Sequence, residues 1–264
     1  MERGHLAAAV AGLQAAGCVF AEDEARLLAS AAATPADLAA MVERRGAGLP
    51  LEHVLGWAEF CGLRVAVDPG VFVPRRRTAL LVGEATAVAD KAPDGTAAVV
   101  VDLCCGSGAV GAALLAALDR IELHAVDIDP AAVACARRNV AAAGGGRVYE
   151  GDLYTPLPGS LRGRVDVLVA NTPYVPTGEI GLLPPEARLH EPRVALDGGA
   201  DGLDVLRRVI AAAPSWLAAG GSLLTEVGRH QASPAVDAIV RAGLVPRVAS
   251  SDELDATVVT GATR

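Results

Sequence analysis

The chain has 264 residues and a formal net charge of −8 at pH 7, and 52% of its residues are hydrophobic. This length suits one large domain with a small appendage rather than two equal domains, because single hydrophobic cores stop growing at roughly 250–300 residues. The negative charge disfavours nucleic acid as a partner, since the field of the protein repels phosphate. A membrane span is not expected, because no run of about 18 apolar residues is free of charge, Gly or Pro.

The five cysteines stand at positions 18, 61, 104, 105 and 135. They show neither paired C-x-x-C spacing nor a Cys/His cluster, which favours reduced thiols over a disulfide framework or a metal site. The N-terminus also lacks the pattern of a secretory signal. We therefore expect a cytoplasmic protein that binds no metal.

Residues 1–48 are alanine-rich, with apolar residues at helical spacings that predict a few short helices. Thr34 followed by Pro35 is typical of a helix start, with a capping residue before proline in the first helical position. From Pro50 to Pro74 apolar residues fall near alternating positions, broken at Asp68-Pro69-Gly70. This second pattern predicts a β-hairpin that joins two parts of the protein.

From about residue 97, short apolar runs alternate with helical patterns. The runs predict strands at 97–101, 123–126, 165–170 and 221–226, helices that reach 118, 140 and 218, and a closing antiparallel hairpin of 244–249 with 256–260. Fully apolar strands alternating with helices are typical of a parallel sheet covered on both faces. The predicted fold is thus α/β, with a doubly wound, mostly parallel sheet that binds ligands at the carboxyl ends of its strands.

A glycine-containing turn, Asp102-Leu103-Cys104-Cys105-Gly106-Ser107-Gly108, follows the first of these strands. Gly106 and Gly108 allow a tight turn and a close approach of the backbone to a ligand. Asp127 follows the second strand, where a carboxylate can accept both hydroxyl protons of a ribose. The combination indicates a nucleoside-containing cofactor. Gly111 completes a G-x-G-x-x-G pattern, so a nicotinamide dinucleotide remains an alternative at this point.

The segment Asn171-Thr172-Pro173-Tyr174 follows the third strand and favours methyl transfer instead. An amide or amine nitrogen on a planar group is a poor nucleophile, because its lone pair is delocalised. The Asn171 side-chain oxygen and the Thr172 carbonyl could accept its two N–H bonds and aim the nitrogen at a sulfonium methyl group. Tyr174 would offer the face of its ring to the substrate and the cationic methyl donor.

Together these motifs resemble the class I S-adenosylmethionine-dependent methyltransferases, and specifically the glutamine N5-methyltransferases that modify peptide chain release factors. The resemblance covers residues 49–231. It includes Pro50-Leu51, Leu55-Gly56, Glu59-Phe60, Val71-Phe72-Val73-Pro74-Arg75 with Thr78, the glycine turn, residues 171–174, Glu191-Pro192-Arg193, residues 195–199 and Asp201-Gly202-Leu203.

The resemblance implies a Rossmann-like domain with a seven-stranded sheet at 79–264, a hairpin linker at 49–78 and a helical docking domain for the protein partner at 1–48. It implies that S-adenosylmethionine is the cofactor and S-adenosylhomocysteine the product. Asn171, Thr172, Pro173 and Tyr174 would hold the target amide. The residues implied around the cofactor are Phe72, Pro74, Arg75 and Thr78 in the cleft, Asp102, Cys104, Gly106 and Gly108 at the methionine part, Asp127 and Ile128 at the ribose, Asp152 and Leu153 near the adenine, and Asn171.

Four positions depart from the family pattern. Thr172 replaces a proline but keeps the backbone carbonyl, and Pro173 holds the residue before it in an extended conformation. Cys104 replaces the first glycine of the turn, which is tolerable if its side chain packs between sheet and helix; we interpret Cys104 and Cys105 as small buried thiols. Arg76 and Arg77 replace proline and glutamate, and are interpreted as a solvated basic patch, or alternatively as a contact to an acidic or phosphate-bearing partner.

The predicted function is methyl transfer from S-adenosylmethionine to the side-chain amide nitrogen (N5) of a protein glutamine, with a peptide chain release factor as the candidate substrate. One alternative keeps the chemistry and changes the target to adenine N6 or another planar nitrogen in nucleic acid or a small molecule. The other alternative is a catalytically silent module that binds the cofactor or a partner.

Overall fold

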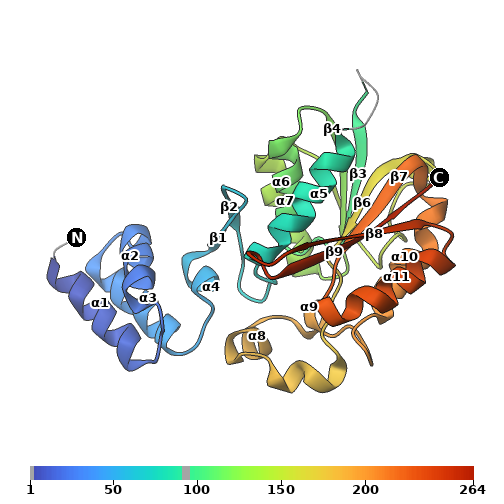
Figure 1. Ribbon diagram of the computed structural model, residues 1–264. Coiled ribbons are helices and arrows are strands. Elements are labelled where there is room, and N and C mark those ends of the chain that lie inside the picture. Colours follow the sequence, from blue (N-terminus) through green and yellow to red (C-terminus); the bar gives the residue numbers. More distant parts are fainter. Residues whose placement is uncertain (1–2, 91–95) are drawn as a thin grey trace.

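The computed structural model describes residues 3–90 and 96–264. In this part of the chain seven strands form one sheet in the order β5-β4-β3-β6-β7-β9-β8 (Figure 1). The strands are β3 Ala98–Leu103, β4 Ile121–Asp127, β5 Arg147–Glu150, β6 Val165–Ala170, β7 Leu217–Glu226, β8 Val245–Ser251 and β9 Ala256–Ala262. Strands β3 to β7 are parallel, and β9 is antiparallel to both β7 and β8. The predicted doubly wound sheet with its closing hairpin is confirmed.

Strands β3 and β6 form the centre of the sheet, and their apolar runs are buried on both faces. The chain continues from β3 to β4 and β5 on one side, and from β6 to β7 on the other. The topological switch point therefore lies between β3 and β6, where open parallel sheets bind ligands. Strand β5 has no counterpart among the predicted strands, because this edge strand is only partly buried and carries no apolar run.

Helices cover both faces of the sheet. On one face are α5 Ala79–Ala89, α6 Ala109–Ala117 and α7 Pro130–Ala142, and on the other are α10 Asp204–Ala212 and α11 Ala232–Arg241 (Figure 1). The predicted helix to residue 218 is wrong beyond Ala212, because Pro214 lies in a 3₁₀ turn, Ala213–Ser215, that leads directly into β7. Short 3₁₀ turns also lie at Arg76–Thr78, Gly159–Leu161 and Arg229–Gln231.

The N-terminal helices form a separate cluster beside the sheet domain (Figure 1). They are α1 Arg3–Ala15, α2 Ala21–Ala31, α3 Pro35–Gly46 and the short α4 Leu51–Leu55. Leu13, Leu28 and Leu38 are almost fully buried at their centre. The Thr34 side chain accepts a hydrogen bond from Asp37 N and Asp37 accepts one from Thr34 N, so the predicted helix start is confirmed.

A two-stranded hairpin, β1 Trp57–Phe60 with β2 Leu63–Ala66, follows α4. Its turn is at Cys61-Gly62, where both residues have positive φ, rather than at the predicted Asp68-Pro69-Gly70. The latter forms a second turn, closed by Val71 N donating to Asp68 O at 3.0 Å, which brings Val71 and Val73 into a buried cluster with α7. The apolar alternation predicted the hairpin but not which of two glycine turns closes it.

The segment between β6 and α10 lies below the carboxyl end of the sheet and next to the N-terminal helices (Figure 1). It contains a 3₁₀ helix Thr177–Leu182, α8 Pro185–His190 and α9 Arg193–Leu196. Arg45 of α3 connects the two regions, because its guanidinium is 2.6 Å from both Glu24 and Glu186. The helices in the described ranges are too short or too polar to span a bilayer.

Candidate active site

A cavity of about 850 Å³ opens at the carboxyl ends of β3, β4 and β6, at the switch point of the sheet. Ligand sites of small molecules and cofactors have volumes of about 300–1,000 Å³. The cavity brings together residues that are up to about 200 positions apart in sequence, from Pro50 before α4 to Leu254 between β8 and β9. All of the predicted site residues line it except Gly108.

The two glycines of the turn after β3, Gly106 and Gly108, have different surroundings. Gly106 has a φ of 54°, and a Cβ added there would meet nothing within 4 Å, so this side of the turn is open to the cavity. Gly108 has a φ of 76°, and its Cβ would come within 3.0 Å of Ala136 in α7. Gly108 therefore does not line the cavity, and its lack of a side chain lets α6 and α7 pack closely.

Gly111 lies inside α6 and packs against β4, since a Cβ there would come within 2.9 Å of Leu123. The third glycine of the G-x-G-x-x-G pattern thus has a packing role in this fold. Its backbone N–H donates to Asp102 Oδ2 at 3.0 Å. Asp102 is 1% exposed, and burial raises the pKa of its carboxyl to about 7.

Asp127 ends β4 and faces the glycine turn. Its carboxylate accepts hydrogen bonds from Gly106 N at 2.8 Å and Asp129 N at 2.9 Å. Burial raises the pKa of this carboxyl, and the two N–H groups partly offset the effect. Each carboxylate oxygen retains a second lone pair, so Asp127 can still accept two hydroxyl protons from a ligand.

The wall beyond Asp127 combines one exposed apolar side chain with an ion pair. Ile128 is 51% exposed at the cavity, whereas Leu153, which also lines it, is 8% exposed and has a φ of 49°. Asp152 pairs with Arg208 of α10 at 2.5 Å. An apolar surface next to a hydrogen-bonding carboxylate is suited to a flat heteroaromatic ring with an exocyclic amine.

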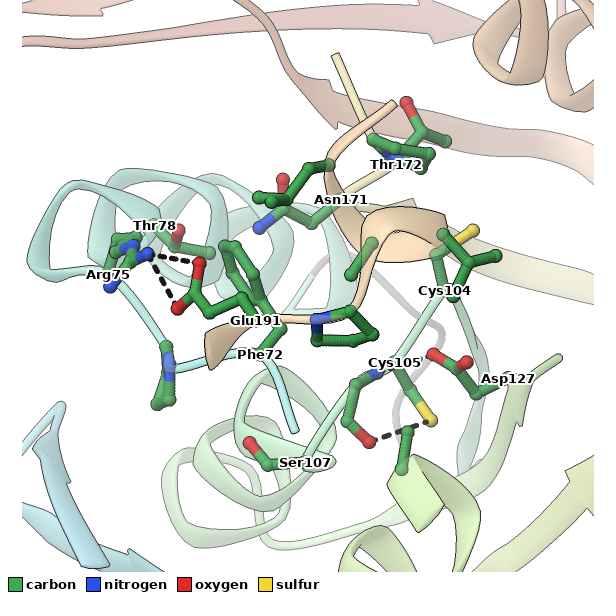
Figure 2. Close-up of a pocket in the computed structure, with 18 of the residues that line it drawn as sticks. Phe72, Arg75, Thr78, Cys104, Cys105, Ser107, Asp127, Asn171, Thr172 and Glu191 are labelled. Atoms are coloured by element: carbon green, nitrogen blue, oxygen red, sulfur yellow. Dashed lines mark hydrogen bonds and ion pairs between the residues drawn. The ribbon is translucent and has the colours of Figure 1, made fainter. Parts of the chain in front are cut away.

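Cys104 adopts a φ of 56°, the left-handed conformation that explains why glycine is usual there. This conformation costs a non-glycine residue roughly 1–2 kcal/mol. Its side chain packs against the core that contains Tyr154 and α10, and its sulfur points away from Asp127 (Figure 2). Burial raises the pKa of both Cys104 and Cys105, which keeps both thiols protonated and unreactive.

Asn171 is the first residue after β6, and its side chain extends over the cavity toward Phe72 (Figure 2). Its Oδ1 atom is buried and has no hydrogen-bond partner within the protein. Buried polar atoms are nearly always partnered, so this atom is poised for a ligand donor. Thr172 is 2% exposed, and its hydroxyl is also buried without a partner, but points away from Phe72 (Figure 2).

Tyr174 is held at both ends. Its carbonyl oxygen accepts a hydrogen bond from Gln231 Nε2 at 2.8 Å, and its hydroxyl accepts one from Arg77. Arg77 Nε also donates to Glu226 Oε1 at 3.1 Å. Burial raises the pKa of the Tyr174 hydroxyl, and the charge of Arg77 partly offsets it.

The opposite wall comes from the β2–α5 connection. Phe72 is partly exposed to the cavity, and the guanidinium carbon of Arg75 lies 4.9 Å from the centre of its ring. Arg75 also makes two hydrogen bonds to the buried Glu191, at 2.7 and 2.6 Å (Figure 2). Pro74 and Thr78 complete this wall. Arg75 thus lines the cavity and at the same time forms an ion pair with Glu191.

The expectation of a solvated basic patch holds for Arg76, which is 84% exposed, but is wrong for Arg77. The guanidinium of Arg77 pairs with Glu226, whose side chain is only 3% exposed. Glu226 and Arg208 were not among the residues predicted for the site. Glu226 had a detectable signal, because it is a charged residue at the tip of a predicted strand, as Asp127 is.

Seven carboxylates and four guanidinium groups line the cavity. Each of the four, Arg75, Arg76, Arg77 and Arg208, has a carboxylate partner. The lining therefore favours a cationic ligand over a polyanion. Within residues 3–90 and 96–264 no cluster of three or more His, Cys, Asp or Glu could hold a metal ion.

The fold and the family model agree on the class of protein. The Methyltransferase small domain model matches residues 62–182. The catalytic domain of hMettl16, solved in complex with the MAT2A 3′UTR hairpin 6, has a TM-score of 0.60 over 85% of this chain and 82% of that chain, at 13% identity. This likeness shows the fold alone. The matched model indicates a methyltransferase, and the doubly wound sheet with its switch-point cavity is the Rossmann-like fold in which such a cofactor site is expected.

Comparison with curated relatives narrows the class to one family. The release factor glutamine methyltransferase of Geobacter sulfurreducens is 42% identical over 79% of this chain and 72% of its own length. That of Mycolicibacterium smegmatis is 37% identical over 96% of this chain and 93% of its own. The ribosomal protein uL3 glutamine methyltransferase of Bordetella pertussis is 38% identical over 79% and 68%. The chain belongs to the release factor glutamine methyltransferase family.

Proposed function

We propose that the protein transfers a methyl group from S-adenosylmethionine to the side-chain amide nitrogen of a protein glutamine, with a peptide chain release factor as the first candidate substrate. The observation that carries the proposal is the buried, unpartnered Oδ1 atom of Asn171 in the wall of the cavity. The names of two relatives support a release factor, and the name of a third supports ribosomal protein uL3 as the second candidate.

The residues around the glycine turn fit the cofactor. In the proposed arrangement the methionine part lies along Gly106, where the backbone is open to the cavity. The two carboxylate oxygens of Asp127 accept the ribose hydroxyl protons, and Ile128, Asp152 and Leu153 surround the adenine. The acidic lining attracts a sulfonium cation. When bound, S-adenosylmethionine supplies an electrophilic methyl group.

The protein's own part in the reaction is to position a poor nucleophile. Asn171 Oδ1 and the Thr172 carbonyl accept the two N–H bonds of the glutamine amide, so that the nitrogen is held rather than free to rotate. Tyr174 lies along the plane of the amide, and the rigid Pro173 fixes the spacing between these groups. As the nitrogen gains its methyl group it loses a proton readily, so no strong general base is required.

The cavity lining argues against nucleic acid as the substrate. A polyanion would need unpaired cations around the cavity, whereas each arginine in the lining has a carboxylate partner. We also propose that residues 1–48 dock the protein partner, since Val19 and Phe20 of this unit are 86% and 69% exposed. The free thiols are compatible with the proposed cytoplasmic location.

The experiment is methylation with isotope-labelled S-adenosylmethionine, offering a release factor and protein uL3 in parallel and mapping the label by mass spectrometry. We expect one added methyl group on a single glutamine of one of the two proteins. Asn171→Ala is the control, and calorimetry should show that it still binds the cofactor. Label on adenine, or none on either protein with the cofactor bound, contradicts the proposed function.

A further inference from the structure

Arg77 lies between the proposed catalytic segment and the end of strand β7. It belongs to the 3₁₀ turn Arg76–Thr78, which follows the cleft residues Phe72 to Arg75. One nitrogen donates to the Tyr174 hydroxyl, and Nε donates to Glu226 Oε1 at 3.1 Å. The guanidinium carbon lies 5.5 Å from the centre of the Tyr174 ring. A single side chain thus connects the aromatic ring to the last residue of β7.

Glu226 gives Arg77 a fixed anchor. Its side chain is 3% exposed, whereas that of Arg77 is 39% exposed. A carboxylate removed from water is stable only with a charged or hydrogen-bonding partner. Burial raises the pKa of Glu226, and the charge of Arg77 opposes this shift. The pair holds the guanidinium against the end of strand β7.

The main chain of Tyr174 is fixed independently of Arg77. Its carbonyl accepts from Gln231 Nε2 at 2.8 Å, and Gln231 is 1% exposed. A Cβ at Gly202 would collide with the same carbonyl oxygen, so the backbone of the two segments is in direct contact. With the carbonyl end held in this way, Arg77 is the group that determines where the hydroxyl end of the ring points.

The charge balance explains why an arginine is tolerable next to a cationic methyl donor. An isolated guanidinium in this wall would repel the sulfonium group, but the carboxylate of Glu226 neutralises it. Lysine could not do the same, because one ammonium group lacks the planar fork that reaches two acceptors in fixed directions. The geometry therefore needs both the charge and the shape of arginine.

We propose that Arg77, anchored by Glu226, is a positioning residue that fixes the Tyr174 ring beside the target amide. The inference rests on the proposed function for the identity of that amide. The fixing of the Tyr174 ring by Arg77 is a property of the protein alone and does not depend on the proposed function.

The test uses the double variant Arg77→Met/Glu226→Gln, which removes the pair without leaving a buried unpaired charge. In the full-length protein we expect kcat for the protein substrate to fall about tenfold, as positioning losses do, while the Kd for S-adenosylmethionine changes less than about twofold. Arg77→Lys should fall in between. The matched control is Arg247→Met/Glu84→Gln, which removes an Arg–Glu pair on β8 and α5 and should leave kcat unchanged.

Two further measurements separate positioning from a general structural role. In a Tyr174→Phe background, where the hydroxyl is absent, the same double change should cost less than about twofold, because coupled residues are not additive. With ¹³C-labelled tyrosine, the Tyr174 ring of the free protein should become more mobile in Arg77→Met/Glu226→Gln, while Tyr149 and Tyr154 stay unchanged. The chain has only 3 tyrosines, so the signals can be assigned.

The inference is overturned if the mobility of the Tyr174 ring is the same in Arg77→Met/Glu226→Gln as in the unmodified protein. It is also overturned if the double change lowers kcat equally with and without the Tyr174 hydroxyl. If the unmodified protein methylates no glutamine, the proposed function fails, and the ring measurement still decides whether Arg77 fixes Tyr174. The two failures are therefore distinguishable.

Discussion

The two sides of the cavity are built in different ways. On the β3–β4 side, backbone N–H groups hold two carboxylates. Asp102 accepts from α6, 9 positions away, and Asp127 accepts from the glycine turn, 21 positions away. On the β6–β7 side, Tyr174 is held by Arg77, 97 positions away, and Arg77 by Glu226, 149 positions away. The first side is organised by local backbone geometry and the second by long-range packing.

The two sides also differ in whether their hydrogen-bond acceptors already have partners within the protein. Both carboxylates of the first side already accept at least one backbone hydrogen bond. The second side leaves Asn171 Oδ1 buried without a partner. A preformed binding wall thus faces a wall with an open acceptor, which is the arrangement expected when one side binds a cofactor and the other orients a substrate.

The largest effect should come from the open acceptor. Asn171→Ala removes the side-chain oxygen that holds the target nitrogen, so we expect methyl transfer to fall by about 10²- to 10³-fold. Because the cofactor contacts of the first side remain, affinity for S-adenosylmethionine should change less than about tenfold. Single-turnover kinetics and calorimetry on one preparation measure both quantities. Turnover equal to that of the unmodified protein would exclude the proposed amide clamp.

The buried carboxyl of the first side should produce a pH-dependent stability. Burial raises the pKa of Asp102 in the folded protein to about 7, above its unfolded value of 3.8. Between these values the folded state binds more protons than the unfolded state, so this group's contribution to stability decreases as the pH rises from about 4 to 7. The decrease is on the order of 4 kcal/mol.

Asp102→Asn removes the titrating group and keeps an oxygen that can accept from Gly111 N. Urea unfolding at several pH values should show a flatter stability profile for this variant than for the unmodified protein. Parallel profiles would show that the carboxyl does not titrate in this range.

Asp127→Ala tests the proposed ribose contact. The loss of two hydrogen bonds to a carboxylate should weaken S-adenosylmethionine binding by roughly 1–3 kcal/mol. Asp129 is a useful comparison, because its carboxylate caps α7 by accepting from Ala131 N and is only adjacent to the proposed ribose position. Calorimetry should therefore show a larger loss for Asp127→Ala than for Asp129→Asn, and an unchanged Kd would mean that the cofactor is wrongly placed.

The smallest effect concerns Thr172, whose hydroxyl is buried without a partner next to the catalytic segment. Thr172→Val removes this hydroxyl at nearly constant shape, and we expect a gain in the free energy of unfolding of about 1 kcal/mol. Chemical denaturation measures it, with Thr177→Val as the control, because the Thr177 hydroxyl donates to Asp197 at 2.6 Å. A loss of stability in Thr172→Val would indicate a hydrogen bond to bound water.

Much of the fold could be predicted from the sequence, because the signals are local. Strand β6 at Val165–Ala170 and the start of α7 at Pro130 lie where the apolar run and the proline predict them. The exceptions have identifiable causes. The edge strand β5 lacks an apolar run, and the hairpin has two glycine turns that compete for its centre.

For the candidate site, the residue types that follow each strand can be recognised in the sequence: Asp102 and the glycine turn, Asp127, and Asn171 to Tyr174. Parallel strands bring their carboxyl ends to one edge of the sheet, so these groups are expected to lie close together. The packing of distant segments, in contrast, places Gly108 against α7 rather than at the cavity and pairs Arg77 with Glu226 instead of leaving it solvated. Both outcomes depend on which distant segment packs against the residue, and no short stretch of sequence contains that information.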